Sequence, residues 1–165
     1  MATQQPETEA CKCVVAVKIR GMVSAQREAR ETTALLGLSH TNHAIIIDNR
    51  PAYMGMLKRA QSYVTWGEAS KEIVTTMLKQ RAKTGGDKKL TEEYAQKLGF
   101  KTIDDLAEAI FSCKAEINKL DGVQKTFRLR PPKKGYKGKT KKSFNAGGEA
   151  GYRGEAINEL VKRMV

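Results

Sequence analysis

The chain has 165 residues, a hydrophobic content of 40% and a formal net charge of +12, with an isoelectric point near 9.7. Its length fits one domain with additions or two small domains, and its charge points to a nucleic acid or an anionic membrane surface as partner. No window approaches the ~18 consecutive apolar residues of a membrane span, so we expect no membrane-embedded protein.

The positive charge is concentrated in two regions. Residues 14–81 carry +5 and residues 122–165 carry +9, whereas residues 87–121 carry −2. A chain that used lysine only for solubility would spread its charge evenly. The distribution therefore favours directed basic surfaces that face a polyanion.

The first half of the chain alternates strand and helix patterns. Strands are predicted at residues 13–19, 44–47 and 63–66, and helices at residues 25–36 and 51–61. Ser24 is expected to cap the first helix and Gly37 to end it, while Pro51 opens the second. Gly55 within the second helix suggests close packing against another element. This β-α-β-α-β order predicts a three-stranded sheet with two helices on one face, in an α+β fold.

The second half is predicted to be helical and then irregular. Helices are expected at residues 70–81, 91–98 and 154–164, with another that begins at the Thr102 cap, and a fourth strand is a candidate at residues 126–129. Residues 82–89 are interpreted as a flexible connector. The predicted organisation is a flexible N-terminus (1–13), a sheet domain (14–68), a helical extension (69–125), a basic Gly/Pro/Lys-rich loop (126–154) and a C-terminal helix (155–165).

The basic loop is the most distinctive segment. It contains a run of eight cations without an acidic residue between them: Arg128, Arg130, Lys133, Lys134, Lys137, Lys139, Lys141 and Lys142. Its prolines and glycines break helices and strands, so we expect it to stay unfolded until a polyanion such as RNA neutralises it. A merely solvated surface loop is the alternative. Tyr136 is interpreted either as a platform for an exposed base or as a residue that packs back onto the fold.

Basic residues of the first half form a second candidate RNA contact. They are Lys18, Arg20, Arg27, Arg30, Arg50, Lys58 and Arg59. Each of them alone is equally well an ordinary exposed side chain, and only together do they suggest a surface.

The sequence offers little for catalysis. The phosphate-binding G-x-x-x-x-G-K-[ST], the nucleophile motif G-x-S-x-G and the metalloprotease motif HExxH are absent. The glycines at Gly147, Gly148 and Gly151 lack the spacing of a nucleotide-binding loop. We expect no enzymatic activity, no cofactor and no small-molecule substrate.

The three cysteines, Cys11, Cys13 and Cys113, are an odd number, and the first residues do not look like a secretory signal. We therefore expect reduced thiols in a cytoplasmic protein, with Cys13 and Cys113 packed as small apolar residues. Zinc held by Cys11, Cys13, His40 and His43 is the alternative, although one residue between the cysteines is an unusual spacing for such a site.

Six stretches occur in an order and spacing that are specific together. They are LGLSHTNH (36–43), PAYMGM (51–56), YVTWGE (63–68), RPPKKG (130–135), GGEAGYR (147–153) and INELVKRM (157–164). The chain thereby resembles the L-thirty family of large-ribosomal-subunit proteins, whose eukaryotic branch is called L-seven-e. The last three stretches resemble the extension of its archaeal and eukaryotic members, and the lack of a long basic N-terminal arm is typical of the archaeal type.

The resemblance implies a ferredoxin-like fold, in agreement with the element order. It also implies a structural protein of the cytoplasmic ribosome that binds 23S rRNA, lies near 5S rRNA and contacts neighbouring large-subunit proteins. A non-ribosomal RNA-binding module or RNA chaperone is the alternative.

By resemblance, Arg20 with Gly21, the turn from Ser39 to Asn42 and the start of the Pro51 helix fall on RNA-contact positions of the family. His40 and Asn42 therefore join the candidate contacts, and Arg153 is a further candidate. The chain departs from the family pattern at three positions, because many members carry arginine or lysine where this chain has Ser39 and His40, and arginine where it has Met54.

Overall fold

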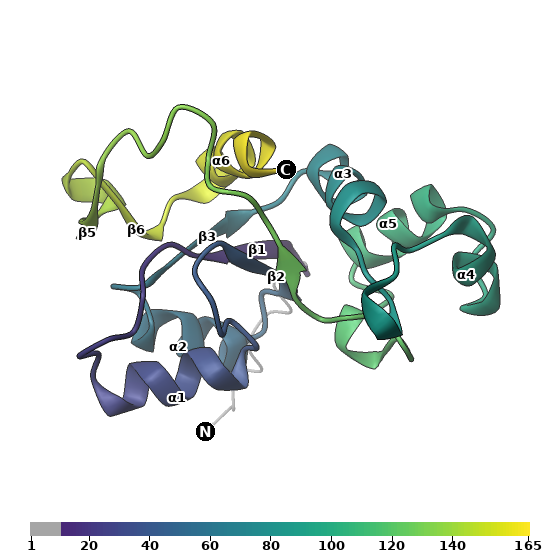
Figure 1. Cartoon of the computed structure of the whole chain (residues 1–165), viewed down its shortest axis with the longest axis horizontal. Coiled ribbons are helices and arrows are strands. Elements are labelled where there is room, and N and C mark those ends of the chain that lie inside the picture. Colours follow the sequence, from purple (N-terminus) through teal and green to yellow (C-terminus); the bar gives the residue numbers. More distant parts are fainter. Residues whose placement is uncertain (1–10) are drawn as a thin grey trace, which may run out of the picture.

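The computed structural model describes residues 11–165, so the flexibility expected for residues 1–13 falls mostly outside the described part of the chain. Within it a six-stranded sheet with the order β4-β2-β1-β3-β6-β5 forms the centre, and helices lie on both faces (Figure 1). The strands are β1 (Cys13–Lys18), β2 (His43–Asp48), β3 (Val64–Glu68), β4 (Phe127–Arg128), β5 (Lys139–Ser143) and β6 (Gly148–Tyr152). The α+β class and the order of elements in the first half are as predicted.

The central strand is β1. It pairs antiparallel with β2 on one side and with β3 on the other, so that Val15 lies opposite both Ile46 and Gly67. All residues of β1 are buried, which explains why its sequence is a nearly continuous apolar run that ends at Lys18. Two further strands extend the sheet, β4 next to β2 and β6 next to β3.

One face of the sheet is covered by α1 (Arg27–Leu35) and α2 (Pro51–Arg59), as Figure 1 shows. Leu38 and Leu57 are fully buried there and belong to one apolar cluster with Val14 and Trp66. These two helices and the strands β1 to β3 are the part of the fold that the alternating pattern predicts.

Three glycine and cap predictions for this face have different outcomes. Gly37 has the predicted left-handed backbone, with φ of 81°. Ser24 does not cap α1, because its own φ is 60° and the helix begins only at Arg27. The close packing expected at Gly55 is also wrong, since a Cβ added there would meet no atom within 4 Å.

The opposite face is covered by α3 (Lys71–Arg81), α5 (Ile103–Phe111) and α6 (Ile157–Met164), while α4 (Glu92–Lys97) packs next to α5. The two helices of the first half thus share one face of the sheet, as predicted, and the later helices cover the other. As predicted, the hydroxyls of Ser70 and Thr102 accept hydrogen bonds from the first turns of α3 and α5. None of the helices among residues 11–165 is long and apolar enough to cross a membrane.

The structure corrects the expectation of an unfolded loop at residues 126–154, a segment that we call the basic arm. It contains β4, β5 and β6, and β6 runs parallel to β3 with Thr65 opposite Gly151. The glycines of the arm do more than interrupt helices and strands. A Cβ on Gly148 would lie 2.1 Å from the carbonyl oxygen of Lys142, so the absence of a side chain lets β5 and β6 approach each other.

The cysteines are not all reduced. A disulfide joins Cys11 to Cys113, and only Cys13 is free and buried. Cys11 therefore does not serve as a metal ligand beside Cys13, and no group of three or more potential metal ligands occurs among the residues that the structure describes. Counting an odd number of cysteines could not reveal this bond, because its partners are 102 residues apart.

Candidate nucleic-acid interface

The basic arm is held along α6 by backbone hydrogen bonds. The amides of Arg130 and Lys133 donate to the carbonyls of Met164 and Arg163, at 2.9 and 3.0 Å. The guanidinium of Arg163 donates in return to the carbonyl of Gly135, at 3.0 Å. These bonds give the arm backbone a defined path along α6.

A buried ion pair between Glu149 and Arg153 fixes the end of the arm. Their side chains are only 5% and 4% exposed, and Arg153 also donates to the hydroxyl of Thr65 at 2.8 Å. Burial alone would raise the pKa of the Glu149 carboxyl. Its bonds from Arg153 and from the backbone N–H of Gly138 outweigh burial and hold that pKa below its usual value. Arg153 thus acts inside the protein and is withdrawn from the exposed RNA contacts.

Tyr136 packs back onto the fold. It is half-buried against the core, and its hydroxyl donates to Oδ1 of Asn42 at 3.2 Å. Burial is also the main reason why the pKa of the Tyr136 phenol is raised. These contacts support the interpretation that Tyr136 packs back onto the fold, and base stacking by its ring stays a prediction.

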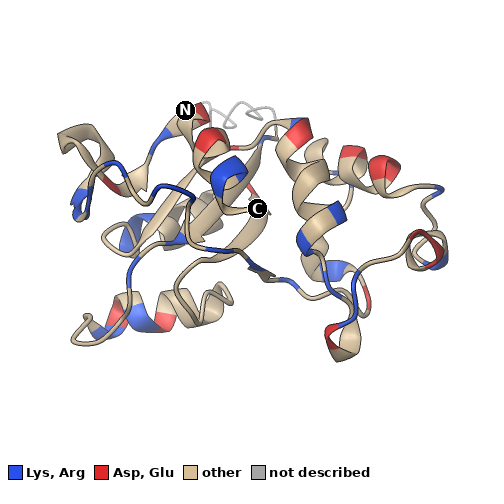
Figure 2. Ribbon diagram, turned by 45° about the horizontal axis from the view of Figure 1, so that its top comes forward, with Lys and Arg blue, Asp and Glu red and all other residues tan. Residues whose placement is uncertain are grey.

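The outward side of the arm is covered by cations without acidic partners. They are Arg130, Lys133, Lys134, Lys139, Lys141 and Lys142, all exposed and none in an ion pair with another residue of the range 11–165. Arg128 and Lys137, by contrast, are paired with Asp87 and Glu159 at 3.1 and 2.8 Å. Figure 2 shows blue segments along the arm, whereas red acidic segments are scattered over other elements, α4 and α5 among them.

A shallow hollow of about 550 Å³ lies at the end of β1. Its lining includes Gly21, Arg30, and the turn residues Ser39 and His40. Lys18 is buried below this turn, where its ammonium donates to the carbonyls of Leu38 and Ser39 at 2.9 and 2.8 Å. Burial lowers the pKa of Lys18. Lys18 therefore shapes the hollow and is not an exposed phosphate contact, which corrects its sequence assignment.

The other predicted cations of the first half differ in whether an acidic side chain pairs with them. Arg27 pairs with Glu31, and Arg50 is held by Asp48 and Glu116. The hydrogen bond from Arg50 is also the main cause that lowers the pKa of the Glu116 carboxyl. The free ones are Arg20, which lies over the ring of Tyr63, and Arg30, Lys58 and Arg59, none of them ion-paired within residues 11–165.

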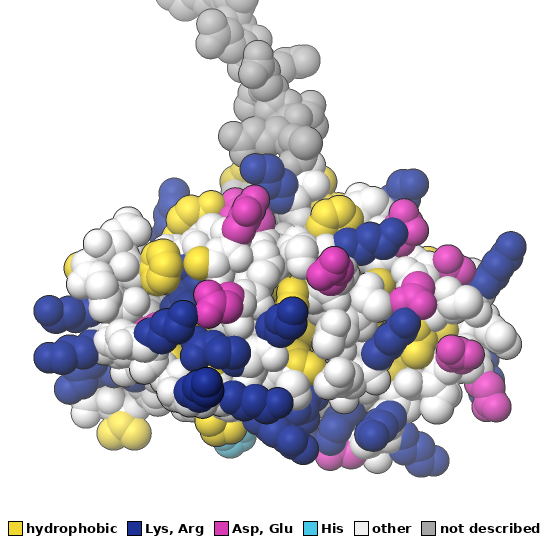
Figure 3. Space-filling model, turned by 90° about the horizontal axis from the view of Figure 1, so that it is seen from above, with side chains coloured by type: hydrophobic (Ala, Val, Ile, Leu, Met, Phe, Trp, Pro, Cys, Tyr) yellow, Lys and Arg dark blue, Asp and Glu magenta, His cyan; other side chains and the backbone are white. Residues whose placement is uncertain are grey.

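Asn42 joins the hollow to the arm. Its carbonyl accepts from the amide of Leu129 at 3.1 Å, and its side chain accepts from Tyr136. The basic regions that are separate in the sequence are thereby connected in the structure. Figure 3 shows dark blue side chains gathered over the left half and the lower edge of the molecule, beside a histidine. Sequence reasoning missed this link and two exposed lysines, Lys125 and Lys162.

Comparisons with known proteins find similarity to one family of ribosomal proteins. The sequence model of the family described as Ribosomal protein L30p/L7e matches residues 14–64, from β1 to the start of β3. The chain is also similar to proteins named Large ribosomal subunit protein uL30. It is 43% identical over 150 residues to that of Thermofilum pendens, which covers 90% of this chain and 96% of the relative. The relative in Ignicoccus hospitalis is 40% identical over 156 residues, with 93% and 98% covered, and that in Methanopyrus kandleri 38% over 149 residues, with 89% and 100% covered.

Proposed function

The chain belongs to the uL30 family of large ribosomal subunit proteins, and from this membership we propose that its basic arm and the hollow beside β1 bind rRNA. The chain is a structural constituent of the large subunit in the cytoplasmic ribosome. The finer part of the proposal is that 23S rRNA lies along the basic face, with 5S rRNA and neighbouring large-subunit proteins close by.

The observation that carries this proposal is the row of unpaired cations on an ordered backbone. Six exposed arginine and lysine side chains of the arm have no acidic partner among residues 11–165, although acidic residues are available elsewhere in the chain. Like charges held close together repel one another unless a counter-charge is near. Phosphates of folded RNA supply that counter-charge, and each neutralised phosphate releases a condensed counterion.

The ordered backbone adds a second argument. Because the arm is already bound to α6 and to β3 through β6, its lysines do not have to lose the full conformational freedom of an unfolded loop on binding. A preorganised basic face suits a structural component that neutralises rRNA segments at fixed positions.

The test is the salt dependence of binding to a 23S rRNA fragment. Replacing Lys133, Lys134, Lys139, Lys141 and Lys142 with alanine is expected to reduce the slope of log affinity against log salt by about 0.7–0.9 for each lost phosphate contact. The matched control removes the same charge from the helical extension, at the exposed lysines Lys88, Lys89, Lys97, Lys101 and Lys114.

The control variant is expected to keep the slope of the unmodified chain. An equal loss in both variants would mean that only net charge matters, and an unchanged slope in the arm variant would contradict the proposal. Co-sedimentation with large subunits through a high-salt wash separates the ribosomal role from that of a free RNA-binding module.

A further inference from the structure

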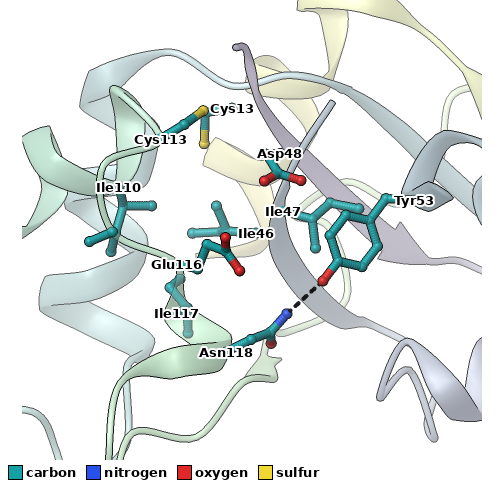
Figure 4. A pocket seen from close by; sticks show the side chains of 11 residues that line it. Cys13, Ile46, Ile47, Asp48, Tyr53, Ile110, Cys113, Glu116, Ile117 and Asn118 are labelled. Carbon is teal, nitrogen blue, oxygen red and sulfur yellow. Dashed lines mark hydrogen bonds between the residues drawn. The ribbon is translucent and has the colours of Figure 1, made fainter. Parts of the chain in front are cut away.

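Two of the three cysteines, Cys13 and Cys113, line one small cavity between the helical extension and the sheet, and Cys113 is bonded to the third, Cys11. Cys13 and Cys113 line it together with Ile46, Asp48 and Glu116, and its volume is about 20 Å³ (Figure 4). This is space for a single water molecule. One carboxylate oxygen of Asp48, Oδ1, is buried without a hydrogen-bond partner among the described residues. The lining of the cavity thus includes a buried carboxylate oxygen that makes no hydrogen bond to the described residues.

The disulfide joins Cys113, which is part of the lining of this cavity, to Cys11 outside it. Cys113 follows the end of α5, and Cys11 precedes β1, so the bond ties the helical extension to the central strand. Other residues of the lining make non-covalent links, namely the ion pair of Arg50 with Glu116 and the hydrogen bond from Asn118 to Tyr53 at 3.3 Å. The disulfide is the one covalent cross-link beside the cavity within residues 11–165.

The two bonded cysteine residues differ in their exposure to solvent. Cys11 is exposed and Cys113 is half-buried, whereas the free Cys13 is only 3% exposed. A soluble thiol can reach Cys11 first. Cytosolic disulfides are usually transient or redox-sensing, so, if the chain works in the cytoplasmic ribosome as proposed, an accessible bond of this kind suits reversible exchange better than permanent cross-linking.

We propose that Cys11 is a site of reversible modification by a low-molecular-weight thiol such as glutathione, and that this exchange opens the cavity at Cys13 and Asp48. The thiolate of glutathione attacks the sulfur of Cys11, the bond between Cys11 and Cys113 breaks, and Cys113 takes the electron pair and then a proton. A second glutathione thiolate attacks the mixed disulfide on Cys11 and releases Cys11 as a thiol. Two glutathione molecules leave as their disulfide, and the protein has gained two electrons and two protons.

Cys13 is not the attacking thiol in this exchange. It is buried, and burial, with a further contribution from the charge of Asp48, raises the pKa of its thiol to about 12. The thiolate is the reactive form, so Cys13 stays inert while the cavity is closed. Its reactivity then reports whether the cavity is open.

The experiment uses the full chain, equilibrated with oxidised or with millimolar reduced glutathione, then alkylated under native conditions and analysed by peptide mass spectrometry. In the oxidised sample we expect a linked Cys11–Cys113 pair and an unlabelled Cys13. In the reduced sample we expect label or glutathione on Cys11, at least a tenfold faster labelling of Cys13, and a melting temperature several degrees lower.

Two variants test whether the effect depends on the Cys11 disulfide and not on a general loss of stability. Cys11→Ser is expected to label at Cys13 as fast as the reduced chain and to be indifferent to glutathione, whereas Cys13→Ala keeps the disulfide. Free Cys11 and Cys113 after oxidation, a bond that survives reduced glutathione, or a Cys13 whose labelling ignores the redox state would each overturn the proposal. Should Cys11→Ser not fold, the labelling of the unmodified chain alone decides. None of these outcomes depends on RNA binding, so the two proposals fail separately.

Discussion

Lys18 and Lys133 both lie in basic stretches of the sequence, but their surroundings give them different roles. The ammonium of Lys18 is buried beneath a turn and donates to two backbone carbonyls. Lys133 is exposed and has no acidic partner within residues 11–165. Arg153 is buried like Lys18, in its ion pair with Glu149. At the scale of residues, burial decides whether a cation supports the fold or is available to a phosphate.

The first prediction concerns the buried pair. Glu149→Gln leaves the charge of Arg153 buried without a counter-charge, and we expect a loss of about 3–5 kcal/mol in the free energy of unfolding. The fluorescence of Trp66, the single tryptophan, measures it in urea because β3 lies next to β6. The matched control is Glu159→Gln, which breaks an exposed pair with Lys137 and should change the free energy of unfolding far less.

The same pair predicts acid sensitivity. The pKa of Glu149 is lower in the folded chain than its usual value, so the unfolded chain binds more protons as the pH falls. The stabilisation by Glu149 is complete above about pH 4.3, the ordinary value for glutamate, and is lost as the pH falls through its lower folded pKa. Glu149→Gln should flatten this part of the stability curve. A mutant with the same loss of stability in acid as the unmodified chain would contradict the assignment.

At the scale of elements, the sequence predicts what depends on apolar periodicity. The strands β1 to β3, the helices α1 and α2, and the caps at Ser70 and Thr102 follow from local patterns. The strands β5 and β6 could not be predicted in this way. Residues of β5 are mostly exposed, and β6 is built from Gly148, Glu149 and other residues that do not favour strands. Their pairing depends on the edge of β3, which is distant in the sequence.

The sequence likewise predicts only part of the candidate RNA interface. The positions of the exposed arm lysines follow from composition alone, since no apolar or acidic neighbour competes for them. Tyr136 and Asn42 could not be assigned, because 94 residues separate the two partners of their hydrogen bond. The burial of Lys18 at the end of an apolar strand could be suspected only from its position in a run that is otherwise buried.

Glycines of two elements give the next prediction. Gly55 lies in α2 with open space where a Cβ would be, so Gly55→Ala should raise the free energy of unfolding by about 0.5–1 kcal/mol. Gly67 in β3 is the opposite case, because a Cβ there would lie 1.9 Å from the carbonyl oxygen of Gly154. Gly67→Ala should cost about 1–3 kcal/mol or more. Urea unfolding of both variants measures the difference, and a stabilising Gly67→Ala would show that β3 and the segment before α6 are not in contact.

At the scale of the whole molecule, acidic and basic residues occupy different parts of the fold. The helical extension, whose sequence is mildly acidic, packs on one end of the sheet (Figure 2). The arm and the hollow beside β1 form the basic part of the surface. Asn42 connects these two basic surfaces through its bonds to Leu129 and Tyr136. The arm and the hollow therefore adjoin each other, and under the proposed function one RNA would contact both.

This arrangement predicts additive effects on RNA binding. Arg20→Ala combined with Arg30→Ala and His40→Ala removes two full charges around the hollow and should lower the salt slope for 23S rRNA by about 1.4–1.8. Adding these changes to the arm variant should lower the slope by the sum of the two separate effects, since the surfaces neutralise different phosphates of the same RNA. Salt titrations of the three variants, with Trp66 fluorescence to confirm folding, measure this. If the combined variant had the slope of the arm variant alone, the hollow would not contact RNA, and the basic face would be restricted to the arm.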